Sequence, residues 1–356
     1  MRKSLRWLLF PFSVLYGSAV YVRNFLFDKK ILQSVTFHLP IICVGNLSVG
    51  GTGKTPMVEY LVQLLQNKYE LGTISRGYKR KTRGYYLADA KTTAMELGDE
   101  PFQFHRKFPK ISVAVGEERI IAVPHLLQDR PNTQVIILDD AFQHRWIKAG
   151  FNILLTAFDS LFTNDFLLPA GNLRDQRSSS GRAEVIVVTK CPPELSLSEK
   201  KTIAEKISFG NGRSIYFTTL QYGELYHFST GKTNVFKLND EVLVVSGIAN
   251  PKPFIQHIAL NTKKTYPLIF SDHHLFSNKD ADTIRNKFDE IKAENKIIVT
   301  TEKDAAKLIQ FEDSLQQLPL YVLPVKHQFL FDEGIQFDYL VTNFITRFYE
   351  TNNDYE

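Results

Sequence analysis

The chain has 356 residues, 44% of them hydrophobic and 23% charged, which is typical of a soluble globular protein with room for two domains. Its two cysteines, Cys43 and Cys191, are too few for a disulfide framework and lack metal-ligand spacing, so a reducing compartment is favoured. The net charge of +5 lies in the first 30 residues, and the even charge of the remainder counts against a nucleic-acid-binding protein.

The N-terminal segment has an uncharged, aromatic-rich stretch at residues 7–22, flanked by basic residues. As a helix it would span about 24 Å, which is shorter than the ~30 Å hydrocarbon core of a bilayer. Pro11 would also disturb its first turns. Basic flanks and interfacial aromatics favour a helix lying on an anionic membrane surface. We therefore expect residues 1–30 to form a membrane-associating helix; a buried first helix and a spanning or signal segment are the alternatives.

Short apolar runs then alternate with helical patterns, which predicts a mostly parallel α/β sheet in a domain over residues 31–213. In chain order, the expected strands are 40–44, 71–75, 111–115, 134–138, 152–155 and 184–189, with helices at 55–67, 100–107 and 117–127.

A second set of alternating elements predicts a smaller α/β domain over residues 236–356. Its expected strands are 242–246, 265–270, 296–300 and 320–323, and its expected helices are 251–259, 279–293 and 334–349. Between the two sets, residues 214–220 and 225–228 alternate apolar and polar side chains, so we expect 214–235 to supply linker strands.

A glycine-rich loop follows the first expected strand and opens a helix. Its backbone N–H groups would cradle the phosphates of a nucleotide, with the positive end of the helix behind them. Lys54 would reach the β- and γ-phosphates, and the Thr55 hydroxyl would bind Mg²⁺. Ser48 stands where the usual P-loop pattern has glycine, and a chance glycine loop is the alternative. The predicted phosphate-binding residues are Ser48, Val49, Gly50, Gly51, Thr52, Gly53, Lys54 and Thr55.

Asp139 and Asp140 end an apolar run that has the form of a buried strand. In P-loop proteins an aspartate at the end of a neighbouring strand holds Mg²⁺, directly or through water. Asp139 is the first candidate for this metal ligand and Asp140 the second; a strand-end aspartate that caps the next turn is the alternative.

The identity of the nucleotide base is indicated by residues 189–192, which are similar to the T-K-x-D element that binds guanine in GTPases. Pro192 occupies the position of the aspartate and has no carboxylate to offer. The sequence therefore favours adenine, and with it ATP and Mg²⁺ as the cofactors.

Further polar clusters stand where strands should end, at residues 75–78, 98–101, 172–175, 272–274 and 301–304. Singly each is more often a cap or turn, but together they suit the carboxyl edge of a sheet, where ligands bind. Adjacent histidines rarely bind one ion, so His273 is better interpreted as a hydrogen-bond partner or proton acceptor than as a metal ligand with His274.

With these segments the chain resembles the tetraacyldisaccharide 4'-kinase (lipid A 4'-kinase) family of Gram-negative bacteria, and Ser48 is part of that family's loop. Ala141 departs from the glycine commonly found there, which affects only the local turn. The segments that carry the resemblance are 48–56, 75–78, 98–100, 138–144, 272–274 and 301–304.

The resemblance implies transfer of the ATP γ-phosphate to the 4'-hydroxyl of an acylated glucosamine disaccharide 1-phosphate. It also implies two α/β domains joined by a short two-stranded linker, and an N-terminal helix at the cytoplasmic face of the bacterial inner membrane. The expected partners are thus the lipid substrate and the membrane surface, without nucleic acid or an obligate protein partner. A nucleotide-driven switch or assembly factor, and a kinase of a soluble metabolite, are the alternatives.

The resemblance also assigns roles to individual residues. Asp99 is the expected base that accepts the hydroxyl proton, with His273 assisting, and Lys54 and Asp139 complete the catalytic set. Arg119 is a further candidate for holding phosphate. The expected substrate-binding residues are Arg76, Tyr78, Asn172 and Arg174.

Overall fold

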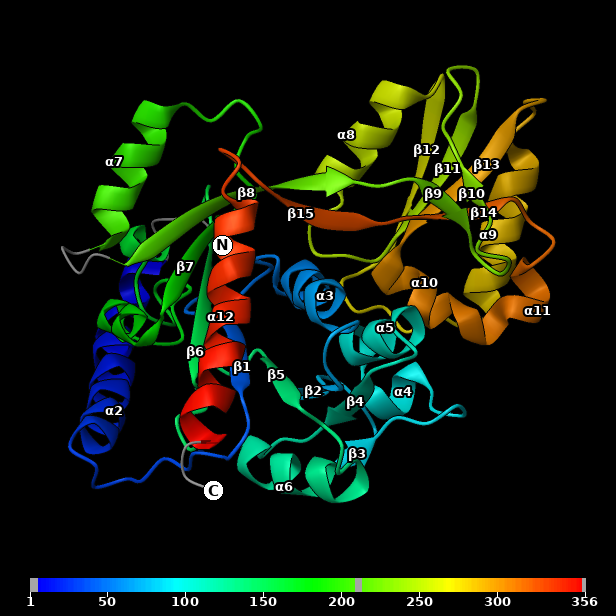
Figure 1. The fold of residues 1–356 in the computed structure, drawn as a ribbon. Helices are drawn as coiled ribbons and strands as arrows, with labels where there is room; N and C mark the ends of the chain where they lie inside the picture. Colours follow the sequence, from blue (N-terminus) through cyan, green and yellow to red (C-terminus); the bar gives the residue numbers. More distant parts are fainter. Residues whose placement is uncertain (1–5, 209–212, 354–356) are drawn as a thin grey trace.

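The structure is a computed structural model that describes residues 6–208 and 213–353. Within these residues two β-sheets, each packed against helices, lie side by side and are connected by two long strands (Figure 1). The larger sheet has nine strands and the smaller has six, and both have parallel strands at their centres. The predicted fold class, a large parallel α/β sheet with a second, smaller α/β part, is confirmed.

The larger sheet is parallel except for one antiparallel strand at each end. Its central strand β1 is buried along its whole length, because neighbouring strands flank it and apolar clusters cover both faces. Parallel strands end at one common edge, so the loops after β1, β2 and β5 gather there. In order across the sheet the strands are β15 (Val325–Phe329), β8 (Ser214–Tyr222), β7 (Val185–Thr189), β6 (Phe151–Ala157), β1 (Ile41–Asn46), β5 (Val135–Asp139), β2 (Leu71–Ser75), β4 (Ser112–Val115) and β3 (Tyr86–Leu87).

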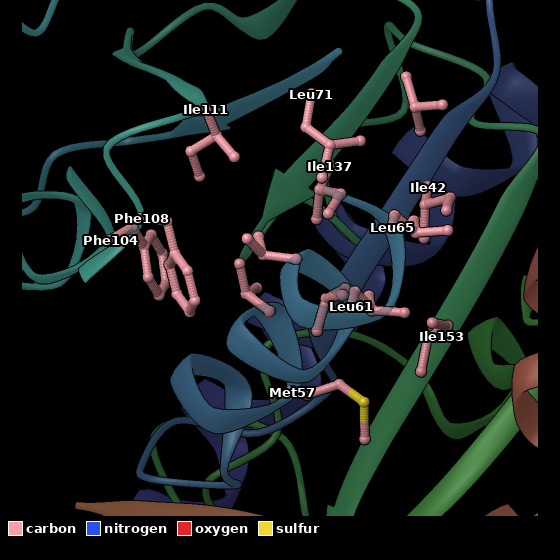
Figure 2. Close-up of a cluster of buried hydrophobic side chains, with 14 of the residues drawn as sticks. Ile42, Met57, Leu61, Leu65, Leu71, Phe104, Phe108, Ile111, Ile137 and Ile153 are labelled. Carbon is pink, nitrogen blue, oxygen red and sulfur yellow. The ribbon is translucent and has the colours of Figure 1, made fainter. Parts of the chain in front are cut away.

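Helix α3 (Lys54–Leu65) packs on this sheet through side chains spaced four residues apart. Met57, Leu61 and Leu65 are fully buried and lie against a cluster that includes Ile42 of β1 (Figure 2). This packing fixes the first turn of α3 at the edge of the sheet where the loops gather. The other helical segments around this sheet are α4 (Ala94–Leu97), α5 (Asp99–Lys107), α6 (Arg119–Asp129), α7 (Leu197–Ser208), η2 (Phe162–Asn164) and η3 (Arg177–Arg182).

The smaller sheet has four parallel strands extended by a short antiparallel hairpin. In order across the sheet these are β10 (Thr233–Asn234), β9 (Leu225–His227), β14 (Leu320–Leu323), β13 (Lys296–Thr301), β11 (Glu241–Ser246) and β12 (Lys264–Ile269). The helical segments that accompany it are α8 (Lys252–Asn261), α9 (Asn278–Glu290), α10 (Glu302–Leu308), η4 (Ile309–Phe311) and α11 (Glu312–Leu315).

Two antiparallel strands connect the sheets. β8 leaves the larger sheet and β15 returns to it, with Tyr222 opposite Val325 and Thr218 opposite Phe329 (Figure 1). The final helix α12 (Gly334–Asn353) then packs on the larger sheet. The expected domain division assigns β15 and α12 to the C-terminal part, so the structure places these two elements differently from that expectation.

The N-terminal segment forms a short turn, η1 (Trp7–Leu9), and helix α2 (Phe10–Asp28), which continues six residues beyond the expected apolar stretch. Each sheet with its helices is called a lobe below. One face of α2 is hydrogen-bonded to the larger lobe: the Ser13 hydroxyl donates to the Leu167 carbonyl, and the Tyr16 hydroxyl donates to the Arg174 carbonyl. Within the described residues, none of the helices combines the length and apolar character needed to cross a membrane.

Candidate active site

The loop between β1 and α3 depends on two glycines. Gly50 and Gly53 have φ values of 112° and 82°, which are strained for residues with a side chain. A Cβ on Gly53 would also lie 3.0 Å from two ring atoms of His327, whereas the space beside Gly50 is open. The loop can therefore keep this path only with glycine at both positions.

Two carbonyl groups of the loop accept hydrogen bonds from side chains that lie outside the loop. Thr189 Oγ1 donates to the Thr52 carbonyl at 2.8 Å, and Lys190 Nζ donates to the Gly51 carbonyl at 2.6 Å. Within the described part of the chain, the N–H groups of residues 50–53 have no acceptor. With the carbonyls held elsewhere, these N–H groups are left for an anion at the N-terminus of α3, as the sequence predicts.

Lys54 and Arg174 both face the carboxylate of Asp140. Lys54 Nζ lies 3.7 Å from Asp140 Oδ1 and 3.3 Å from Asn46 Oδ1. Arg174 donates to both Asp140 oxygens, at 2.7 and 3.1 Å. Burial raises the pKa of Asp140, but the charges of Lys54 and Arg174 outweigh it and bring the pKa to about 2. Asp140 therefore stays ionised and holds both cations beside the loop.

Asp139 is in a different environment, although it is the adjacent residue. It is 3% exposed at the end of β5, and its Oδ1 has no hydrogen-bond partner among the described residues. Burial, followed by the charges of Glu100 and Asp140, raises the pKa of Asp139 to about 7. A buried carboxylate oxygen without a partner fits a cation in its vicinity.

Such a cation would need ligands from outside the protein. Among the described residues, no group of three or more His, Cys, Asp or Glu side chains could hold a metal. Mg²⁺ commonly takes one or two carboxylates and completes its shell with phosphate and water oxygens. Asp139, with the Thr55 hydroxyl at the start of α3, therefore fits Mg²⁺ that arrives with a nucleotide.

Arg119 supplies a fixed positive charge behind this edge. It is 1% exposed, and it donates to the carbonyls of Gly116 and Glu117 at 3.1 Å each. Burial lowers the pKa of Arg119 to about 10, which leaves it charged at neutral pH. Burial, and then the charge of Arg119, lower the pKa of His144 to about 4, so this imidazole is neutral.

Asp99 and His273 form a pair across the two lobes. Asp99 is the first residue of α5, and His273 follows β12 with a φ of 57°. His273 Nδ1 lies 3.2 Å from Asp99 Oδ2, and the Tyr78 ring packs edge-on against the imidazole with centroids 5.3 Å apart. The sequence predicts a role for all three residues, and the structure brings them together.

Two of the expected substrate-binding residues remain. Arg76 is exposed and directly follows β2, so it lies at the edge of the sheet where the loops gather, and its charge contributes to lowering the pKa of both Arg119 and His144. Asn172 lies beside the loop: its side chain donates to Asp165 at 2.8 Å, its carbonyl accepts the Val49 N–H at 2.8 Å, and its role in substrate binding stays a prediction. Asn172 thus supports the loop through its backbone.

His327 is a site residue that the sequence does not indicate. It lies on β15, is 3% exposed, and its Nε2 is 2.9 Å from the Gly53 carbonyl oxygen. Its Nδ1 is 2.9 Å from Thr218 Oγ1 on β8. Burial lowers the pKa of His327 to about 4, so the ring is neutral and its Nε2–H donates to the loop. No local sequence pattern predicts this contact, because His327 and Gly53 are 274 residues apart in the chain.

The two halves of the site are connected through Glu100. Its charge raises the pKa of Asp139, and it directly follows Asp99 in α5. A phosphate loop, a buried acid suited to a divalent cation and a neighbouring carboxylate–imidazole pair are the components of phosphoryl transfer to a hydroxyl group.

Comparison with known proteins gives consistent matches. The family model described as LpxK, tetraacyldisaccharide-1-P 4'-kinase, matches residues 5–344. The tetraacyldisaccharide 4'-kinase of Flavobacterium johnsoniae is 48% identical over 92% of this chain and 93% of that protein, and that of Bacteroides thetaiotaomicron is 40% identical over 96% and 93%. A crystal structure of LpxK from Aquifex aeolicus in complex with ATP is 30% identical, covers 96% of this chain and 99% of that chain, and has a TM-score of 0.75.

Proposed function

Because the chain belongs to the tetraacyldisaccharide-1-P 4'-kinase family, we propose that it transfers the ATP γ-phosphate to the 4'-hydroxyl of a tetraacyldisaccharide 1-phosphate, a lipid A precursor. The single observation that carries the proposal is the Asp99–His273 pair, which joins the two lobes; its Asp99 lies in the same helix as Glu100, whose charge acts on Asp139. The pair supplies the proton acceptor that a sugar hydroxyl needs and that a nucleotide-driven switch does not.

The residues divide the reaction between them. The loop N–H groups and Lys54 hold the β- and γ-phosphates, and Arg174 stays oriented by Asp140 at the same edge. Thr55 and Asp139 would hold Mg²⁺, which neutralises charge on the phosphates when it is bound. Asp99 accepts the proton of the attacking hydroxyl, and His273 orients the carboxylate. Arg76 and Tyr78 contact the acceptor.

The proposal includes the cytoplasmic face of the bacterial inner membrane as the place of action. The outward face of α2 exposes large apolar side chains, and Lys29 and Lys30 follow it. This combination suits a helix lying in the headgroup region of an anionic bilayer. An acylated acceptor stays in the bilayer, so the enzyme has to reach it there. The exposed apolar residues are Leu8 of η1 and, on α2, Phe10, Phe12, Val14, Leu15, Tyr21, Val22 and Phe25.

The test is a transfer assay with purified protein, ATP, Mg²⁺ and detergent-dispersed tetraacyldisaccharide 1-phosphate. The expected product gains one phosphate at the 4'-position, as measured by mass spectrometry and position-specific NMR. The matched control omits the lipid and measures ATP hydrolysis. Well-folded protein that binds ATP but makes no bisphosphorylated lipid would contradict the proposal.

A further inference from the structure

Helix α10 of the smaller lobe presents two lysines to the Asp99–His273 pair. Lys303 and Lys307 are four residues apart, so they lie on one face of the helix. Lys303 Nζ is 3.3 Å from His273 Nε2, and Lys307 Nζ is 3.8 Å from Asp99 Oδ2. One helical turn thus brings a cation to each member of the pair.

Lys307 is almost completely buried, with 3% of its surface exposed. Its Nζ lies 3.0 Å from Asp304 Oδ1, but neither atom has a properly aligned hydrogen bond within the described residues. Asp304 is itself held through its other oxygen by the Gly247 N–H and the Thr301 hydroxyl, at 2.8 Å each. A buried ammonium is costly unless it serves a partner, and its second carboxylate neighbour is Asp99.

The contacts of Asp99 fall on one of its two oxygens. His273 and Lys307 both approach Oδ2, whereas no residue in the described ranges makes a hydrogen bond to Oδ1. Lys303 donates to His273 Nε2, which leaves Nδ1 protonated and able to donate to Asp99. The free oxygen is the one available to a hydroxyl group.

We propose that Lys307 is a positioning residue for Asp99: its buried ammonium holds Oδ2 together with His273 and leaves Oδ1 to receive the proton. This inference rests on the proposed function, because it takes Asp99 as the base. Both holding groups come from the smaller lobe, so the base is complete only when the two lobes are in contact.

These groups account for every bond and proton that changes in the transfer step. The acceptor oxygen forms a bond to the γ-phosphorus, and the bond from that phosphorus to the β–γ bridging oxygen breaks. Its electron pair leaves with ADP, and the hydroxyl proton moves to Asp99 Oδ1. Lys307 places a positive charge beside Oδ2, on the side of the carboxyl group away from the oxygen that receives the proton.

Other charged groups also face the pair and have to be considered in any pH profile. Glu100 lies 3.8 Å from Lys303 Nζ, and Asp272 lies 3.9 Å from both Lys303 Nζ and His273 Nε2. A cavity of about 210 Å³ adjoins Asp99, His273 and Lys307, and its remaining charged lining residues are Lys79, Lys81 and Arg106.

The test compares the pH profile of kcat in three variants. Lys307→Met removes the cation, Lys307→Arg keeps it, and the double variant Asp304→Asn, Lys307→Met removes both charges and leaves no stranded buried carboxylate. We expect both Met variants to lose at least tenfold in kcat, with the acidic limb moved to higher pH and the KM for ATP within twofold. Lys307→Arg should restore the position of the limb. Lys200→Met, which removes the 2.5 Å ion pair to Glu333, is the control.

A double-mutant cycle measures the contact without using activity. In urea unfolding, the effects of Asp99→Asn and Lys307→Met on the unfolding equilibrium constant should fail to multiply in the double variant. A wild-type pH limb in a folded Met variant, or a multiplicative cycle, overturns the inference. If the wild-type protein makes no phosphorylated lipid, the proposed function fails, and the cycle alone decides whether Lys307 holds Asp99.

Discussion

His327 Nε2 lies 2.9 Å from the carbonyl oxygen of Gly53, so the strand that returns from the smaller sheet is bonded directly to the phosphate loop. The same ring is held by Thr218 on the outgoing strand. The shape of the loop is therefore coupled to the two strands that connect the lobes.

Replacing this ring should weaken ATP binding. His327→Phe removes both hydrogen bonds, each worth about 0.5–1.5 kcal/mol, so we expect an affinity loss of roughly tenfold by calorimetry. His327→Gln keeps a donor near the Nε2 position and should lose less. His257→Phe, on α8 of the smaller lobe, is the control. Equal affinity in the Phe variant and the wild type would show that the loop does not need His327.

Loss of the lysine or of the base should separate binding from turnover. Lys54→Ala should lower kcat at least a hundredfold and weaken ATP binding, because it removes the charge at the β- and γ-phosphates.

Asp99→Asn should lower kcat by about 10²–10⁴-fold and leave ATP affinity within twofold. Steady-state kinetics together with nucleotide titration make the comparison. Near-normal turnover of Asp99→Asn would exclude it as the base.

Glu59 should make the protein less stable as pH rises. Lys107 Nζ lies 2.6 Å from both Glu59 and Glu302, so two carboxylates share one ammonium between the lobes. Burial, and then the charge of Glu302, raise the pKa of Glu59 to about 7. Between its ordinary value near 4.5 and about 7, the folded state holds a proton that the unfolded state releases, so stability falls across this window.

The measurement is the free energy of urea unfolding at pH 5 and pH 7.5. The decrease between these pH values should be smaller in Glu59→Gln, which carries no titrating group at this position. Glu290→Gln, exposed on α9, should keep the wild-type decrease. Identical decreases in the wild type and Glu59→Gln would rule out this carboxyl as their source.

Binding to anionic vesicles should depend on the outer face of α2. The triple variant Phe12→Ser, Leu15→Ser, Val22→Ser keeps the contacts of Ser13 and Tyr16 with the larger lobe. Each apolar side chain contributes about 1.5–3 kcal/mol when buried, so co-sedimentation affinity should fall by more than tenfold.

A matched control changes three exposed leucines elsewhere: Leu197, Leu238 and Leu260, each to Ser. This control should bind vesicles like the wild type. Equal losses in the two triple variants would show that general surface hydrophobicity, not α2, sets the affinity.

The sequence predicted the sheets well where a strand is buried on both faces. Residues 134–138 and 184–189 have continuous apolar runs, and β5 and β7 lie within one residue of them. Such runs are local signals. The loop at residues 48–55 was predictable for the same reason, since its chemistry is contained in eight adjacent residues.

Contacts between distant segments were not predictable in this way. The helix predicted at residues 334–349 was correct. The spacing of its apolar residues does not indicate, however, that Phe337 and Val341 are buried against the larger sheet and not the smaller one. His327 and Lys307 likewise acquire their partners only through tertiary packing. The hydrogen bond from the Asn172 side chain to Asp165 is a further contact that no local pattern in the sequence indicates.

The path of the chain through β8, the smaller sheet, β15 and α12 affects how the protein can be assembled during synthesis. The smaller lobe is built from one continuous stretch, residues 225–323, whereas the core of the larger lobe includes Ile42 and Ile345. A nascent chain can complete the smaller lobe while the larger one still lacks its last helix. The later domain in the sequence can thus mature first, which reverses the usual N-terminal-first order of folding on the ribosome.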